Sequence, residues 1–211
     1  MQPAVFWTRE DKSILCKLCL RRCKITKAGF CKVRIVKDSK LYTKNYLKFQ
    51  LEEKSVEECN LFHFKPFTKS IEISSIGYNF PKSYKNVKET KKYTTEKLLS
   101  EIRKIKAENV VFSFEPIIYF ESFYKVVKFI FREGLNNIFS SNCYFPSQLA
   151  KIIGKYCSVA LINIYSSLSE KYYKEELNVE NIKPIIKTSL ALKKQGMHLE
   201  FVNYITKYSD Y

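Results

Sequence analysis

Short apolar runs alternate with stretches of helical periodicity from Ser70 to the end of the chain. The runs are rich in β-branched and aromatic side chains, which is typical of strands buried in a sheet. They predict five strands, at residues 71–77, 110–114, 137–140, 159–162 and 198–204.

The intervening stretches predict helices, because their apolar residues recur three and four positions apart. Two of these helices end at glycines, Gly134 and Gly196, which suit a left-handed C-terminal cap. The expected helices cover residues 94–105, about 120–133, 146–156, 168–177 and 181–195.

Strands that alternate with crossover helices predict an α/β fold with a parallel sheet and right-handed connections. Five strands fit either an open doubly wound sheet or an incomplete (βα) barrel, and periodicity does not separate the two. The chain has only five glycines and lacks a Gly-rich loop, which argues against a dinucleotide-binding or P-loop fold.

The first 50 residues differ from the rest in pattern. Their apolar runs are short, and cysteines and charges are dense, which predicts a small irregular module with brief strands. We therefore divide the chain into a basic module at 1–50, a connector at 51–69 and an α/β domain at 70–211.

The charge is strongly positive and unevenly placed. The 211 residues contain 37 Lys and Arg against 21 Asp and Glu, a formal net charge of +16 with a pI near 9.4. Residues 12–48 hold twelve basic side chains and one acidic one, and residues 82–92 hold five lysines and one glutamate. Such an excess indicates a polyanionic partner such as RNA.

Composition also excludes several classes of protein. An apolar content of 45% is enough for a core, so the chain is not a disordered polycation. No apolar run reaches the ~18 residues of a membrane span, and the N-terminus lacks the order of a secretory signal. We expect a cytoplasmic protein with no membrane partner.

Four of the seven cysteines fall within sixteen positions, in a C-x2-C-x3-C-x7-C pattern. In a reducing compartment, crowded cysteines indicate a metal before disulfides, and four thiolates can close a tetrahedron around zinc. We expect structural zinc here, with an iron–sulfur cluster or free thiols as the alternatives. The predicted ligands are Cys16, Cys19, Cys23 and Cys31.

Basic side chains surround these cysteines and recur in the later lysine run. A zinc module with Arg and Lys on its surface is suited to contacts with a phosphate backbone. The predicted nucleic-acid contacts are Arg21, Arg22, Lys24, Lys27, Lys32, Arg34, Lys82 and Lys85.

The order of these features resembles a radical-SAM family, the enzymes related to pyruvate formate-lyase activase that accompany the Memo and AMMECR1-type proteins. The resemblance runs over residues 5–206 and rests on five motifs in order. They are the cysteine pattern with Gly29–Arg34, the tyrosines of 41–46, Phe62–Pro66, Phe114–Pro116 and Ser141–Tyr144. It implies a truncated radical-SAM-like fold, an incomplete barrel of about five parallel strands.

The chain departs from this family where the chemistry would lie. The family's loop carries three cysteines that hold a [4Fe–4S] cluster, and the matching positions in Gly77–Lys85 are Tyr78, Lys82 and Lys85. The family's Asp-Leu-Lys after the fourth strand is Asn163–Tyr165, and the chain as given ends after the fifth strand. A lysine ammonium is no iron ligand, so we expect no reductive SAM cleavage and no enzymatic activity.

These observations favour a non-catalytic RNA-binding protein of a ribonucleoprotein particle, with ribosomal RNA and ribosomal proteins as the most natural partners and no DNA sequence specificity. Two alternatives remain: a pseudoenzyme that binds a true radical-SAM system, and a SAM or iron–sulfur enzyme with altered ligands. The remaining chemically notable residues, Glu115, His63, His198 and the three isolated cysteines, have structural roles in this interpretation.

Overall fold

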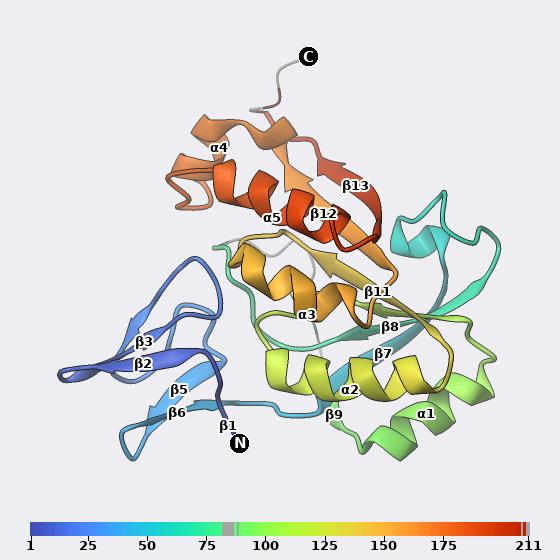
Figure 1. The fold of residues 1–211 in the computed structure, drawn as a ribbon, viewed down its shortest axis with the longest axis horizontal. Helices are drawn as coiled ribbons and strands as arrows, with labels where there is room; N and C mark the ends of the chain where they lie inside the picture. The colour runs from blue at the N-terminus through green and yellow to red at the C-terminus, as the bar shows by residue number, and fades with distance from the viewer. Residues whose placement is uncertain (82–86, 88, 208, 210–211) are drawn as a thin grey trace.

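A computed structural model of the chain describes residues 1–81, 87, 89–207 and 209. Its centre is a seven-stranded sheet with the order β13-β12-β11-β10-β8-β7-β9 (Figure 1). The five predicted strands are confirmed and are parallel to one another. They are β8 (Lys69–Ser74), β10 (Asn109–Phe112), β11 (Asn136–Ser141), β12 (Val159–Tyr165) and β13 (His198–Tyr204).

The strand order bears on the two sheets that the sequence left open. From β8 to β13 each new parallel strand is added on the same side of the previous one, whereas a doubly wound sheet reverses direction. The described part of the chain therefore lacks the reversal that marks a doubly wound sheet. In the described part of the chain the sheet is open, with β13 and β9 as its end strands.

The connector contributes to this sheet. Strand β7 (Lys48–Ser55) pairs antiparallel with β8, and the short β9 (Lys91–Lys92) pairs antiparallel with β7. The connector at 51–69 therefore begins as a strand, continues through a 3₁₀ turn at Glu57–Cys59 and crosses one face of the sheet.

The helices follow the predicted order. Helix α1 is capped by the Thr94 hydroxyl, which accepts from the Lys97 amide at 3.2 Å, and Gly134 after α2 has φ +75°. The helices are α1 (Thr95–Lys104), α2 (Phe120–Arg132), α3 (Ala150–Gly154), α4 (Glu170–Glu175) and α5 (Lys183–Lys193).

Helix α3 is shorter than its apolar pattern predicts. A 3₁₀ turn at Ser147–Leu149 precedes it, and the helix ends at Gly154, before the predicted end at residue 156. The β-branched Ile152 and Ile153 next to a glycine make this a poor helical sequence, so the pattern continues beyond the helix.

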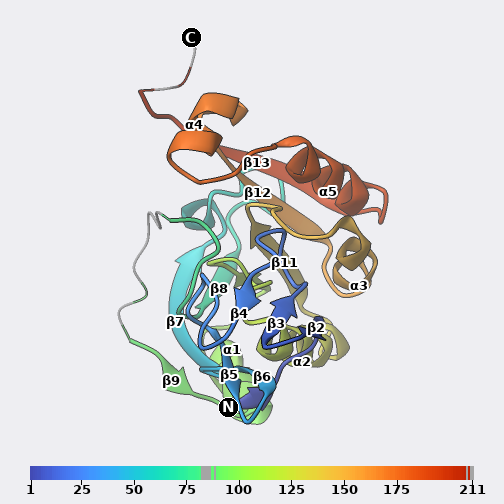
Figure 2. The ribbon, with the colours of Figure 1, turned by 90° about the vertical axis from the view of Figure 1, so that its left-hand side faces the viewer.

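The two faces of the sheet are covered differently. Alternate strand residues such as Phe112 and Phe139 join the large core with the helices, while Val111, Ile138 and Leu161 form a small second cluster with Val56 and Leu61 of the connector. Figure 2 shows α2, α3 and α5 on one side of the sheet. The connector packs on the opposite face of the sheet, where Val111 and Leu161 also line a pocket.

The N-terminal module consists of two three-stranded antiparallel sheets, as its short apolar runs predict. Their strands are β1 (Gln2–Pro3), β2 (Trp7–Glu10), β3 (Ser13–Cys16), β4 (Lys24–Ile25), β5 (Arg34–Lys37) and β6 (Lys40–Thr43). None of the described helices is long and apolar enough to cross a membrane.

The module docks onto loops that follow the carboxyl ends of the parallel strands. The Leu20 amide donates to the carbonyl of Tyr144 after β11 at 3.2 Å. Gly77, after β8, has φ +117°, and a Cβ there would lie 2.1 Å from Cγ2 of Val33. Glycine at position 77 therefore allows the module to approach this closely.

Candidate functional site

The structure brings the four predicted cysteine ligands to one small cavity. Cys16 ends β3, Cys19 and Cys23 lie in the β3–β4 loop, and Cys31 lies before β5; all four line the cavity. The Cys16 amide donates to the Cys23 carbonyl at 3.0 Å, which fixes the two ends of the loop. All four predicted ligands thus lie at one cavity, and zinc binding there stays a prediction.

Burial sets the acidity of three thiols in this cavity. It raises the pKa of Cys16, Cys19 and Cys31, because a buried thiolate loses its hydration. Among the residues that the structure describes, no three His, Cys, Asp or Glu side chains are arranged to hold a metal ion. A metal would have to displace the protons and draw the sulfurs together.

Arg21 fastens this cysteine loop to the α/β domain. Its Nε donates to the Asn79 carbonyl at 2.7 Å, and its terminal nitrogens donate to the carbonyls of Leu177 and Asn178. The guanidinium also lies 4.5 Å from the centre of the Phe30 ring. Burial lowers the pKa of Arg21, and carbonyl oxygens satisfy its donors, so its role is internal.

The other predicted phosphate contacts fall into three groups. Arg34 is 1% exposed and is paired with Glu121, so we leave it out of the candidate surface. Lys82 and Lys85 lie outside the described residues. The remaining four are exposed on the module: Arg22, Lys24, Lys27 and Lys32.

The edge strand β9 carries further exposed lysines. Lys92 is directly opposite Lys48 of β7, and Lys91 is the next residue along. Like charges directly opposite on paired strands are destabilising, and lysine on an edge strand also discourages pairing with another sheet. The lysine run at 82–92 thus continues along a sheet edge in its described part.

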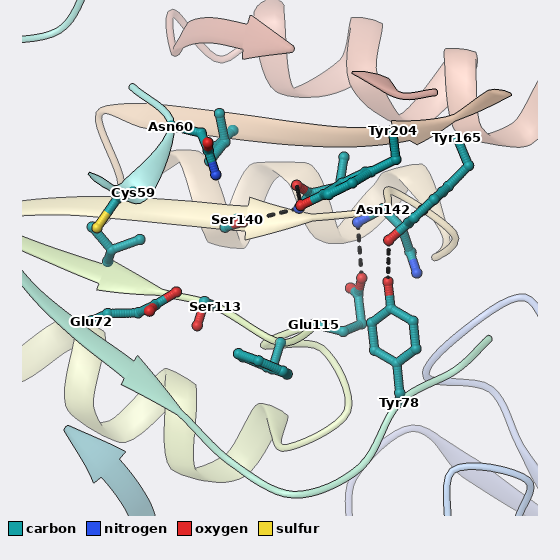
Figure 3. A pocket seen from close by; sticks show the side chains of 14 residues that line it. Cys59, Asn60, Glu72, Tyr78, Ser113, Glu115, Ser140, Asn142, Tyr165 and Tyr204 are labelled. Atoms are coloured by element: carbon teal, nitrogen blue, oxygen red, sulfur yellow. Dashed lines mark hydrogen bonds between the residues drawn. The ribbon is translucent and has the colours of Figure 1, made fainter. Parts of the chain in front are cut away.

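A second candidate site is a pocket of about 560 Å³, including its open mouth, beside the carboxyl ends of the parallel strands. Ligands of open α/β sheets bind at this edge. Figure 3 shows its side chains, which come from all five parallel strands or the loops after them and, at Cys59 and Asn60, from the connector. Polar or aromatic lining residues include Glu72, Tyr78, Ser113, Glu115, Asn142, Asn163, Tyr165 and Tyr204.

Glu115 lies at the base of this pocket and is 2% exposed. One carboxylate oxygen accepts from the Ser141 hydroxyl at 2.7 Å, and the other accepts from the Asn142 amide at 2.9 Å. Burial raises its pKa to about 7 despite these two donors. These bonds fit the structural role expected of Glu115, and the structure adds that Glu115 also lines a pocket.

Tyrosines form one wall of the pocket. The Tyr78 and Tyr165 hydroxyls lie 2.6 Å apart, and the rings of Tyr165 and Tyr204 are stacked with centroids 5.1 Å apart. Tyr78 occupies the position that the resemblance gives to the first cluster cysteine. The Tyr78 hydroxyl is thus hydrogen-bonded to Tyr165, and its ring packs against Phe80.

The residues that match the family frame around Tyr78 have structural partners in this chain. The buried Asn79 accepts from the Asn142 side chain at 2.7 Å, and the ring of Phe80 contacts those of Tyr144 and Tyr173. These contacts alone therefore explain why Asn and Phe stand at positions 79 and 80.

The sequence interpretation missed one polar cluster. The chain has two histidines, and both contact Glu200 of β13: Nδ1 of His63 at 3.4 Å and Nε2 of His198 at 3.1 Å. Glu200 also accepts from the amides of Phe62 and His63. His63 and Glu200 are 137 residues apart, so their spacing gives no signal of the contact. The isolated Cys59, Cys143 and Cys157 are buried, as expected.

Comparison with known proteins identifies no family. No family model matches the chain, and neither does any curated protein. The structural comparison finds a crystal structure of an uncharacterised protein with 10% sequence identity and a TM-score of 0.36. The match covers 66% of this chain and 35% of that chain, so this chain spans about a third of that protein's length.

Proposed function

We infer that this chain is a non-catalytic RNA-binding protein of a ribonucleoprotein particle such as the ribosome, with a zinc-stabilised N-terminal module and an incomplete barrel derived from a radical-SAM enzyme. The observation that carries this proposal is the exposure of Arg22, Lys24, Lys27 and Lys32 on the module that bears the four cysteines.

Exposed cations near an aromatic surface are what an RNA backbone and its bases require. Lys24 has an acidic neighbour, Glu10 at 3.6 Å, but the lysine side chain is 75% exposed, so this pair is weak. The Arg21 guanidinium lies over the ring of Phe30. Phe30 is nevertheless 43% exposed, and the exposed part of the ring is a surface on which a base can stack.

The non-catalytic part of the proposal rests on Tyr78. A phenol that is hydrogen-bonded to Tyr165 and packed against Phe80 takes the place of a thiolate. The strand order adds support for the proposed origin, since parallel strands in sequence order with helices on one face are what a partial (βα) barrel has.

The RNA-binding test compares two variants with equal charge. One removes the four module cations (R22A/K24A/K27A/K32A), and the control removes four exposed lysines of the C-terminal half (K151A/K187A/K193A/K194A). Affinity for single-stranded RNA is measured from about 50 to about 200 mM salt. With four phosphate contacts, wild-type affinity should fall about 50-fold over this range.

The module variant should bind weakly and with a flatter salt dependence, while the control retains most of the affinity and the slope. Equal losses in the two variants would show that net charge alone binds RNA and would contradict the proposed surface. A flat salt response of the wild type would contradict RNA binding itself.

The zinc site has its own measurement. Protein purified without chelator should contain about one zinc per chain, and Cys19→Ser should lose it. Cys157→Ala is the matched control, because Cys157 lies between α3 and β12 and outside the cysteine cavity. Iron together with a brown colour would support the cluster alternative, and a metal-free wild type would refute both.

A further inference from the structure

The pocket of Figure 3 has the opposite charge character from the protein as a whole. Its lining includes the carboxylates of Glu72 and Glu115, and none of the lining residues in the described part of the chain is Lys, Arg or His. In a chain with a net charge of +16, such a pocket repels phosphate groups and favours a cation. It is therefore distinct in chemistry from the proposed RNA surface.

The two carboxylates are not equivalent. Glu72 forms an ion pair with Lys54, which also contacts Glu52 at 2.7 Å. Glu115, in contrast, is bonded by a hydroxyl and an amide, and in the described part of the chain it has no cationic partner. A buried carboxylate with no counter-ion is costly, and a bound cation would relieve that cost.

Ser113 provides a second and independent sign of a ligand. It lines the same pocket and is 5% exposed, and its hydroxyl has no hydrogen-bond partner in the described part of the chain. Ser113 comes directly after β10, two residues beyond Val111, and Val111 is opposite Glu72 of β8. Buried hydroxyls are normally satisfied, so this one is suited to accept from a ligand.

The aromatic wall supplies the remaining contact. Tyr165 and Tyr204 are stacked beside the pocket, and Phe114 and Tyr78 also line it. Aromatic faces attract organic cations and pack against methylene groups. A carboxylate, an unpaired hydroxyl and aromatic rings together match a group with several N–H donors and an alkyl stem.

We propose that this pocket binds a small primary alkylammonium ion, whose –NH₃⁺ group donates to Glu115 and to the Ser113 hydroxyl while its alkyl stem contacts the tyrosines. An ammonium has three donors, which two such acceptors can use. A dianionic ligand would be repelled by the Glu115 carboxylate, and a neutral apolar ligand satisfies neither group.

The test uses nuclease-treated, RNA-free protein, titrated with propylammonium or 1,4-diaminobutane and observed by NMR. Both should shift resonances of the pocket residues, and propionate should not. Tetramethylammonium, which has the charge but no N–H donor, should bind at least about tenfold more weakly. Binding should strengthen from about pH 6 to about pH 8, because Glu115 must be ionised.

Glu115→Gln and Ser113→Ala should each weaken binding by about tenfold or more, as expected for hydrogen bonds to a charged group. Glu175→Gln removes an exposed carboxylate of α4 and is the matched control, with no effect expected. Equal binding by wild type and Glu115→Gln, or binding of propionate as strong as that of propylammonium, would overturn the proposal. The thermal midpoint of each variant shows whether it is folded, and RNA binding stays measurable whatever the outcome.

Discussion

The guanidinium of Arg34 lies 3.0 Å from the carboxylate of Glu121, and both side chains are withdrawn from solvent. Arg34 comes from the N-terminal module and Glu121 from the first turn of α2. The Thr43 hydroxyl donates to the same carboxylate at 2.7 Å. This ion pair holds the module against the α/β domain.

Removing one partner of this pair should be strongly destabilising. We expect Arg34→Ala to lower the free energy of unfolding by about 3–5 kcal/mol, because it leaves Glu121 charged and buried. The exposed pair of Arg103 and Glu133, at 2.8 Å, is the control, and Arg103→Ala should cost less than about 1 kcal/mol. Urea denaturation measures both. Similar losses would show that the Arg34 pair is not effectively buried.

Glu115 should make stability depend on pH. Its pKa is raised from 4.5 to about 7 in the folded protein, so the folded state binds more protons between these values. Stability should therefore fall as pH rises, by about 3 kcal/mol across this window. Glu115→Gln should remove that part of the pH dependence and be more stable than wild type at about pH 8. If the stabilities of the two proteins changed in parallel with pH, the raised pKa of Glu115 would be contradicted.

Glu200 should make the stability of the fold change with pH in the opposite direction. Burial alone would raise its pKa, but the amides and the two histidines that bond it lower the pKa below 4.5. Its contribution is present above about pH 4.5 and is lost as the pH falls through the lower folded value. The stability gap between wild type and Glu200→Gln should thus be largest near neutral pH and should close in acid. Glu175→Gln, on an exposed site, should show no such gap.

Gly77 should be sensitive to a single methyl group. Gly77→Ala adds a Cβ at φ +117° and 2.1 Å from Val33, so both strain and overlap oppose it. The control Gly134→Ala has φ +75° but nothing within 4 Å of the added atom. We expect the first variant to lose about 2 kcal/mol or more beyond the second. Chemical denaturation measures the difference, and equal losses would exclude the close contact with the module.

Local pattern predicted more of this fold than of its site. The strand β13 matches its predicted bounds. Gly196 marks where the strand begins, and a change of polarity marks where it ends. Helix α3 is shorter than predicted because Ile152 and Ile153 have helical periodicity without helical propensity. Periodicity also gave no strand order, because order depends on how the connections pack.

The site residues show the same division. Cysteine spacing predicted the shared cavity, because the four residues are close in sequence. Charge counting predicts a surface cation at Arg34, because it does not register burial and the acidic partner is 87 residues away. The Ser113 hydroxyl, which has no partner among the described residues, has no sequence signal at all, since any buried strand can carry a serine.

Arg21 lies between two of the cysteines, and its guanidinium is held by carbonyls from segments 58 and 156–157 residues further along the chain. Whatever orders the cysteine loop must therefore also order the junction with the domain. Loss of structure in the loop releases those carbonyls at the same moment, so the module and the domain should unfold in one cooperative transition rather than as two independent units.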